Sequence, residues 1–348
     1  MQLFLITNGS KRGATSRGNT LNTKGEMIMI LKSILSAALV IFSSSAYGEL
    51  PGLESAYLRH LSKTKNMIMS QSLIKDTIPN TCSQQVIDIR ADGKIDILVA
   101  FGYMDVSNGQ QFKDTGNYLY GPGDVLDIDA KNALRSLLKS PCPSAKKIFA
   151  CGFRGNGDTL QKKIKDRWSK TRLKVTVTLL SPSVTGVDAI NVSSKASQQE
   201  KKSQQAKQQF LQALTNKDAV LYLGHARSGG GPDFYPPVLK SNGKVDYSYY
   251  KSKKEGIRSM LGALEQTSTP ASVIGVLACN STGLFSASIK KRAPNSILVT
   301  AADLFDYNDI LPTGYAMLEA IVSQRCASEF SNVSKVQPGS SKFLRVSF

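Results

Sequence analysis

The chain has 348 residues, a formal net charge of +18 and apolar side chains at 41% of its positions. This length allows one large domain or two ordinary ones, and this apolar content excludes a chain that is disordered throughout. The charge favours acidic partners, but the basic residues are scattered and lack the basic-aromatic pattern of nucleic-acid readers. We therefore expect no nucleic-acid partner and allow contact with acidic envelope surfaces.

Residues 27–48 have the pattern of a secretory signal peptide. Lys32 supplies a positive start, an apolar stretch follows from Ile34 to Phe42, and small residues suited to cleavage come next, at Ser44, Ala46 and Gly48. The apolar part is short for a stable membrane span, which is the alternative interpretation. The sequence therefore predicts an exported protein, periplasmic or extracellular, without a stable span.

The expected organisation of the chain has five parts. Residues 1–26 are polar and do not fit in front of a signal peptide, so we interpret them as a misassigned leader, with translation starting at Met27 or Met29. After the signal peptide at 27–48 come an N-terminal helical segment (49–93), one α/β domain (94–325) and a C-terminal tail (326–348).

Helices and strands are predicted to alternate along this domain. A helix over 53–69 precedes it, and a strand starts at residue 94 and ends near Gly102. The pattern then predicts a helix over 129–140 capped by Asp129, a strand over 145–153, a helix over 158–168 capped by Asp158, and a strand over 172–182. Further along we expect helices over 197–216, 251–266, 281–291 and 313–324, strands over 218–226, 271–280 and 295–305, and an edge strand at 342–348.

Six of these strands are continuous apolar runs, and most are separated by amphipathic helices. Such strands are buried on both faces, which is typical of a parallel sheet covered by helices on each side. The expected fold is an α/β protein, a three-layer α/β/α sandwich around a mainly parallel, six-stranded sheet.

Export makes the five cysteines informative, because an oxidising compartment favours disulfides. Cys142 and Cys151 are close enough in sequence to close a small loop. The others are Cys82, Cys279 and Cys326, and four of the five could form two disulfides in three possible pairings. One cysteine then stays unpaired, and we expect it to be Cys279 because of the nucleophilic role considered for this residue.

Reactive side chains end two of the predicted strands. His225 ends the run "AVLYLGH" and Cys279 ends "VIGVLAC", after strands of similar length with one helix between them. A strand–helix–strand unit returns parallel to a neighbouring strand, so both side chains should emerge at the carboxyl edge of the sheet, where open α/β sheets bind ligands.

A cysteine beside a histidine suits nucleophilic catalysis. The thiolate is the nucleophile, the imidazole promotes its formation, and it can then protonate a leaving amine. Glycines after the histidine, including Gly229 and Gly230, allow close approach of a peptide backbone. Main-chain N–H groups at Ala226 and Cys279 are candidates to hold an oxyanion.

These two segments resemble the signature of the caspase-like cysteine peptidases, a superfamily that includes caspases, metacaspases, legumains, clostripain and gingipains. The match is best at "LACNSTGLF", which is similar to the cysteine loops of legumains and gingipains. The order of strands resembles that of the superfamily over residues 94–325. The resemblance implies a caspase-like fold, Cys279 as nucleophile, His225 as general acid/base, and a peptide or protein substrate cut at an internal bond.

The resemblance also identifies departures and further candidates. The family usually has glycine where Ala226 stands, and several members have an acidic or amide residue where Leu277 stands. Members that cut after Arg or Lys use buried carboxylates beside these strand ends, which makes Asp233 and Asp303 candidates for a substrate pocket.

No cofactor or metal is expected. Some relatives need calcium, but the acidic group at Asp124, Asp127 and Asp129 lacks the spacing of a calcium loop, and helix capping is favoured.

Three functions remain open, of which the weakest is a basic envelope protein that binds acidic polymers through charge alone. The first is an exported cysteine endopeptidase with a Cys279–His225 dyad. The alternative is a catalytically weak or inactive caspase-like domain that binds a peptide or an envelope component in the same cleft, and Ala226 favours it. The sequence predicts neither the substrate nor the oligomeric state.

Mass spectrometry of the native protein tests the expected start of translation. Because a start at Met27 or Met29 omits the polar leader, a digest should contain no peptide from residues 1–26. Recovery of such a peptide would refute this interpretation.

Overall fold

A computed structural model describes residues 52–70, 92–106, 112–114, 117–143, 148–167, 169, 171–304, 306–325, 330 and 344–347. All of them belong to one compact unit, Tyr47–Phe348, and the other unit of the chain, Met1–Ala46, lies outside the described residues. The predicted leader and signal peptide are therefore outside them, as are Cys82 and Cys326.

Within the described residues, one mixed, mostly parallel sheet has seven strands in the order β4-β5-β1-β6-β7-β8-β9. Its five central strands are mutually parallel, namely β5 (Arg172–Leu180), β1 (Lys94–Phe101), β6 (Ala219–Leu223), β7 (Val273–Leu277) and β8 (Ile297–Ala301). The outer strands β4 (Thr159–Lys165) and β9 (Leu344–Ser347) are antiparallel to their neighbours. Every residue of β6, β7 and β8 is buried, which accounts for their uninterrupted apolar sequences.

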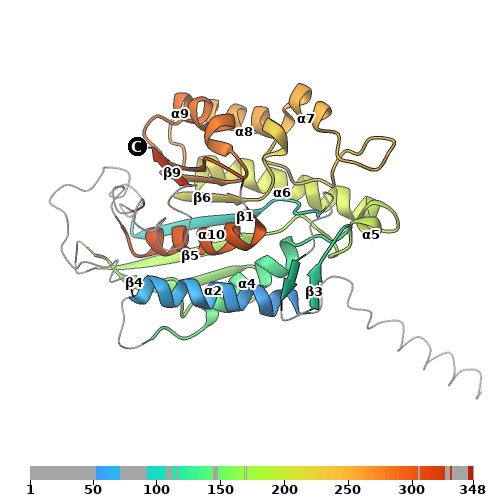
Figure 1. Cartoon of the computed structure of the whole chain (residues 1–348). Coiled ribbons are helices and arrows are strands. Elements are labelled where there is room, and N and C mark those ends of the chain that lie inside the picture. The colour runs from blue at the N-terminus through green and yellow to red at the C-terminus, as the bar shows by residue number, and fades with distance from the viewer. Residues whose placement is uncertain are drawn as a thin grey trace, which may run out of the picture. The chain divides into compact units, whose positions relative to one another are not determined.

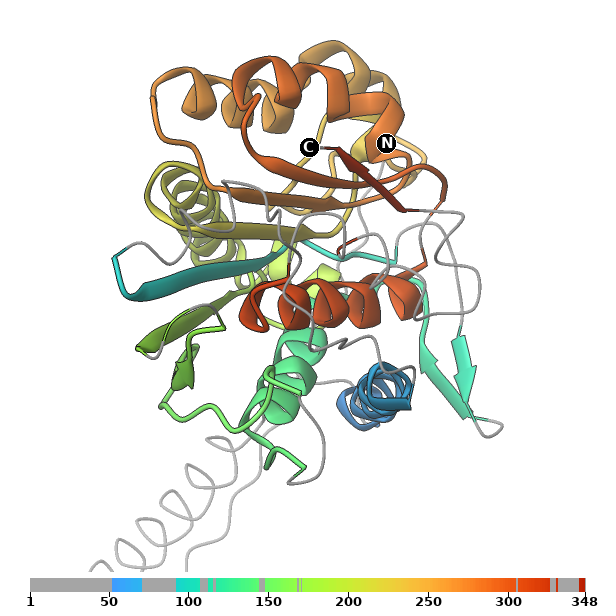
Figure 2. The same cartoon turned by 90° about the vertical axis from the view of Figure 1, so that its left-hand side faces the viewer.

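Helices cover both faces of this sheet (Figures 1 and 2). On one face lie α2 (Leu53–Ser70), α4 (Asp127–Lys139) and α10 (Tyr307–Val322), and on the other lie α6 (Ala196–Asn216), α8 (Glu255–Glu265) and α9 (Ala287–Arg292). The short helices α5 (Asp188–Val192) and α7 (Tyr247–Lys253) precede α6 and α8. A separate hairpin joins β2 (Phe112–Asp114) to β3 (Asn117–Tyr120). The predicted α/β fold with helices on both sides is thus confirmed.

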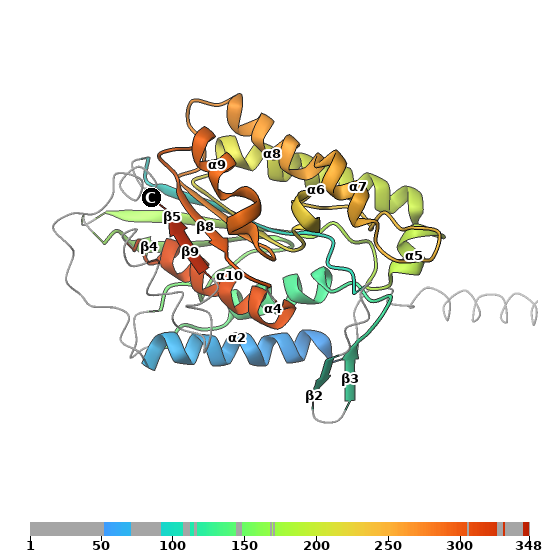
Figure 3. The ribbon, with the colours of Figure 1, turned by 45° about the horizontal axis from the view of Figure 1, so that its top comes forward.

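The N-terminal helix α2 packs along α4 and α10 (Figure 3). Leu53, Tyr57 and Leu61 are spaced by four residues and are buried, so they form one apolar stripe of the helix. Helix α10 approaches the sheet closely through Gly314, where a Cβ atom would lie 2.6 Å from Leu223 Cδ2. The close approach of α10 to the end of β6 therefore requires a glycine at this position.

The strand predicted over 145–153 is wrong in its described part, because residues 148–153 form no strand. A disulfide between Cys142 and Cys151 closes this loop, as the sequence suggested. The main-chain N–H groups of Phe149 and Ala150 donate to the Glu319 carboxyl group, and Lys162 donates to the Phe149 and Cys151 carbonyl oxygens. Side chains of other elements thus satisfy backbone groups that a neighbouring strand would otherwise bind.

The helix predicted over 158–168 is also wrong, since Thr159–Lys165 form strand β4. Leu160 and Ile164 are buried and four residues apart, a spacing that places them on one face of a helix or of a strand. This segment forms a strand because its backbone pairs with β5. Asp158 caps no helix and instead bonds Lys131 at 2.9 Å. Five of the six predicted strands remain once 145–153 is removed. The antiparallel edges β4 and, as expected from 342–348, β9 bring the sheet to seven strands.

Three helix boundaries differ from the predictions. The helix expected over 251–266 is broken at Lys254, whose φ of +52° ends α7 and begins α8. Helix α4 starts at Asp127, so Asp129 lies in its first turn and does not cap it. Helix α10 starts at Tyr307 although Pro312 favoured a later start, and it has Asp306 as its cap. The earlier start of α10 brings Tyr307 to the carboxyl edge of the sheet.

Glu319 on α10 is a buried acid that holds the disulfide loop, with 3% of its surface exposed. Burial raises the pKa of Glu319 to about 7, although the N–H groups of Ala150 and Phe149 and the charge of Arg325 oppose that shift. Because this pKa lies above that of an unfolded glutamate, the folded state keeps the proton longer than the unfolded chain does. The free energy of unfolding therefore falls as the pH rises from about 4 to about 7.

Glu319→Gln should remove this pH dependence. The glutamine amide oxygen can still accept both N–H groups, because Phe149 and Ala150 both contact Oε2, at 3.0 and 2.6 Å. Between pH 4.5 and pH 7.5, the free energy of unfolding of the wild type should fall by up to about 3 kcal/mol relative to that of the variant. Urea unfolding of both proteins across this range measures the difference, and parallel stability curves would contradict it.

Candidate active site

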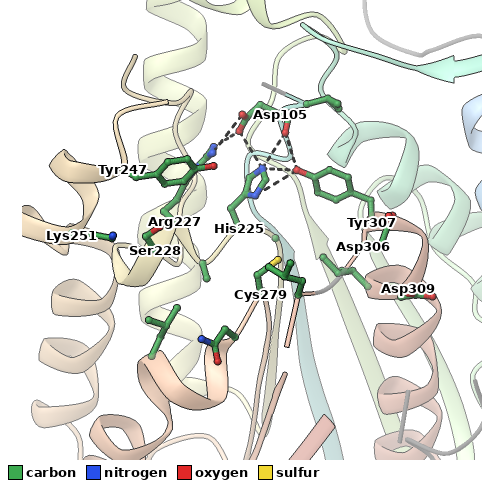
Figure 4. A pocket seen from close by; sticks show the side chains of 17 residues that line it. Asp105, His225, Arg227, Ser228, Tyr247, Lys251, Cys279, Asp306, Tyr307 and Asp309 are labelled. Atoms are coloured by element: carbon green, nitrogen blue, oxygen red, sulfur yellow. Dashed lines mark hydrogen bonds and ion pairs between the residues drawn. The ribbon is translucent and has the colours of Figure 1, made fainter. Parts of the chain in front are cut away.

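His225 and Cys279 lie at the same level of the sheet. Strands β6 and β7 pair in register, with Leu223 opposite Leu277, and each candidate residue follows two positions later. The Gly224 N–H donates to the Leu277 carbonyl oxygen at 3.2 Å, which extends the pairing beyond the strands. Both residues line one cavity of about 710 Å³ at the carboxyl edge of the sheet (Figure 4).

The loop after His225 begins without backbone strain at Ala226. This residue has φ −79° and ψ −17°, in the right-handed region that alanine adopts readily. The unusual backbone comes next, at Arg227 and Ser228, with φ values of +46° and +50°. Each such conformation costs a non-glycine residue about 1–2 kcal/mol, so other contacts must hold the loop.

Arg227 supplies those contacts by pairing with two aspartates. Arg227 is buried, with 1% of its side chain exposed, and lies between Asp105, which follows β1, and Asp233. Arg227 Nε donates to Asp233 Oδ2 at 2.9 Å, and its two terminal nitrogens contact the Asp105 carboxylate. Burial alone would raise the pKa of Asp105, but the charges of Arg227 and His225 hold that pKa well below its usual range. Asp105 and Arg227 are therefore both charged at neutral pH, and their ion pair holds the loop.

Asp105 and Tyr307 surround one nitrogen of the His225 imidazole. Nε2 lies 3.1 Å from the Asp105 main-chain oxygen, 3.4 Å from Asp105 Oδ1 and 2.5 Å from Tyr307 Oη. The Tyr307 ring meets the imidazole edge-on, with centroids 5.5 Å apart. In Figure 4 the Cys279 thiol lies on the side of the imidazole away from Asp105. The imidazole orientation thus leaves Nδ1 as the nitrogen that is not bound to Asp105.

The loop that carries Cys279 is anchored to β8. The Ser281 hydroxyl donates to the Val276 carbonyl oxygen at 2.6 Å and accepts from the Ala301 N–H at 2.8 Å. The Asn280 N–H donates to the Asp303 carbonyl oxygen at 2.8 Å. Cys279 is half-buried and takes part in no disulfide with any described residue. A half-buried thiol on a fixed loop is suited to reaction with a molecule that enters the cavity.

The remaining predicted pocket residues lie elsewhere. The Asp233 carboxylate is bound by Arg227, and Asp303 is exposed and does not line the cavity, so neither carboxylate faces His225. Gly229 is buried near Leu284, and Gly230 packs on Tyr250, where a Cβ would lie 2.9 Å from the tyrosine side chain.

Besides Asp105, Arg227 and His225, the side chains of Lys251, Asp306 and Asp309 line the cavity. Sequence reasoning missed Asp105, Arg227 and Tyr307. The position of Asp105 just after the first predicted strand was a signal that could have identified it.

The acidic group considered for calcium is engaged in local structure. The Asp127 carboxylate accepts from Ser183, and Asp124 Oδ2 accepts from the Gly121 N–H at 2.6 Å. Among the described residues, no three His, Cys, Asp or Glu side chains are grouped so that they could hold a metal ion. In the same part of the chain, no helix combines the length and the apolar character needed to cross a membrane.

No protein-family model, curated protein or solved structure matches this chain. The chemistry available to the site follows from its own groups: a thiol, an oriented imidazole and a cavity that both of them face.

Arg227→Met should destabilise the protein by about 3–5 kcal/mol, because it leaves two buried carboxylates without their counter-charge. Arg292→Met is the matched control, since Arg292 pairs with Glu265 at a half-exposed position and its loss should cost about 0–1 kcal/mol. Urea unfolding measures both. A loss below 1 kcal/mol for Arg227→Met would show that the buried ion pairs do not hold the loop.

Proposed function

We propose that the protein is an exported, caspase-like cysteine endopeptidase that hydrolyses peptide bonds through Cys279 and His225. The observation that carries this proposal is their common level on adjacent parallel strands, facing one cavity. Helices α7 and α8 form the single connection between the two strands. A histidine and a cysteine that end neighbouring strands across one such connection support the resemblance to the caspase-like superfamily.

In the first half of the reaction the Cys279 sulfur attacks the carbonyl carbon of the substrate, and its proton passes to His225. Nδ1 is the accepting nitrogen, because Asp105 and Tyr307 surround Nε2. The oxyanion of the tetrahedral intermediate binds main-chain N–H groups at Ala226 and Cys279. When the C–N bond breaks, His225 returns the proton to the leaving amine, and a thioester to Cys279 remains.

In the second half a water molecule enters and gives a proton to His225 as it attacks the thioester. The C–S bond breaks, the carboxylic acid product leaves, and the proton restores the Cys279 thiol. The Asp105 carboxylate, 3.4 Å from Nε2, stabilises the imidazolium that forms in each half. This reaction needs no metal ion or cofactor.

The conformation of Ala226 favours catalysis over the binding-only alternative. The concern raised by alanine at this position is backbone restriction, and φ −79° with ψ −17° is a conformation that alanine and glycine share. The amide that would contribute to the oxyanion site is therefore available without the strain that a left-handed conformation would impose.

Two further features support an exported peptidase. The Cys142–Cys151 disulfide suits an oxidising compartment. Leu284 and Leu304 line the cavity with 37% and 76% of their surfaces exposed, so an extended peptide could bury apolar side chains there.

Cys279→Ala should abolish cleavage of a peptide library while changing the melting temperature little, because the side chain is only half-buried and small. Ser286→Ala, a nearby substitution outside the cavity, is the control and should retain activity. Undiminished cleavage by Cys279→Ala would rule out the dyad. If neither the wild type nor Cys279→Ala cleaves peptides, but both bind library peptides in this cleft, the binding-only alternative replaces the endopeptidase.

A further inference from the structure

Tyr307 forms a three-way contact with Asp105 and His225 at the start of α10. Its hydroxyl oxygen is 2.8 Å from the Asp105 main-chain oxygen and 2.5 Å from His225 Nε2, while its distance to Nδ1 is 3.5 Å. The side chain is 7% exposed, and Tyr120 packs against the ring edge-on. This hydroxyl is therefore held beside the imidazole, nearer Nε2 than Nδ1 (Figure 4).

The directions of these hydrogen bonds follow from the number of donors. The Asp105 carbonyl oxygen can only accept, so the single Tyr307 O–H proton satisfies it at 2.8 Å. The Tyr307 oxygen then accepts, and the donor that faces it is His225 Nε2–H. Asp105 Oδ1 is a further acceptor on the same side, at 3.4 Å. Three acceptors around Nε2 favour the tautomer that carries its proton there.

We propose that Tyr307 is a positioning residue that keeps the neutral His225 imidazole protonated at Nε2, so that Nδ1 is the base available to Cys279. The importance of this role for catalysis rests on the proposed function. The tautomer itself does not depend on that function. Tyr307 holds its own proton throughout, because burial and the nearby Asp105 charge raise its pKa well above the ordinary value of a phenol.

The chain contains only two histidines, so nitrogen-15 NMR of uniformly labelled protein can identify the His225 tautomer, with His60→Gln to assign the signals. The titratable and charged groups that face His225 are Asp105, Tyr307 and Cys279, with Arg227 bound behind Asp105. At a pH where His225 is neutral, we expect a protonated Nε2 and a bare Nδ1 in the wild type. A protonated Nδ1 would overturn the proposal even if no Tyr307 variant folds.

Tyr307→Phe removes the hydroxyl and keeps the ring. The share of the Nδ1-protonated tautomer should rise, and alkylation of Cys279 by iodoacetamide near neutral pH should slow about 10- to 100-fold. Peptide mapping assigns the alkylated cysteine. Tyr315→Phe is the matched control: it is the same change on the same buried helix, and the Tyr315 hydroxyl contacts the Ala150 carbonyl oxygen away from the site.

The outcomes separate this role from the proposed function. An unchanged tautomer and alkylation rate in Tyr307→Phe would refute positioning, whether or not the protein cleaves peptides. The expected shifts in a protein that cleaves no peptide would support positioning and refute the endopeptidase. Equal effects of Tyr307→Phe and Tyr315→Phe would mean that the hydroxyl acts only through the stability of α10, which also refutes the role.

Discussion

The buried pairing of Arg227 with Asp105 and Asp233 is the interaction on which the site depends. Asp105 follows β1, and Arg227 and Asp233 belong to the loop after β6, so the pairing ties together two neighbouring strand ends. It holds two non-glycine residues in the left-handed region, directly after Ala226, whose own conformation is relaxed. A charge network of this kind is costly to desolvate, and here it ties the loop after β6 to the end of β1.

Asp105 contacts three neighbours through different atoms. Its carboxylate binds Arg227, and its main-chain oxygen accepts from the Tyr307 hydroxyl and lies 3.1 Å from His225 Nε2. Because the same residue fixes the guanidinium and the imidazole, the position of the candidate base is coupled to the position of the loop that follows it. Arg227 thereby affects the position of His225 through Asp105.

Helix α10 connects the site with a distant part of the fold. Its first residue, Tyr307, contacts His225; Gly314 lets it approach β6; and Glu319 binds the backbone of the disulfide loop. These contacts lie on one rigid element, so the disulfide loop and the cavity share a support. The helix is apolar on nearly all sides because it lies beneath α2 and against the sheet.

Sequence patterns determined the central strands, most of the helices and the place of His225 and Cys279 at one level of the sheet edge, because buried parallel strands are continuous apolar runs whose carboxyl ends share one edge. They did not distinguish strand from helix at Leu160 and Ile164, since a four-residue spacing fits both, and they did not show that Glu319 and Lys162 would satisfy the backbone at Phe149. Only the tertiary structure decided the roles of Asp105, Arg227 and Tyr307. These residues come from segments more than seventy residues apart, and charge pairing or tautomer choice depends on distances of a few ångströms that local sequence does not specify.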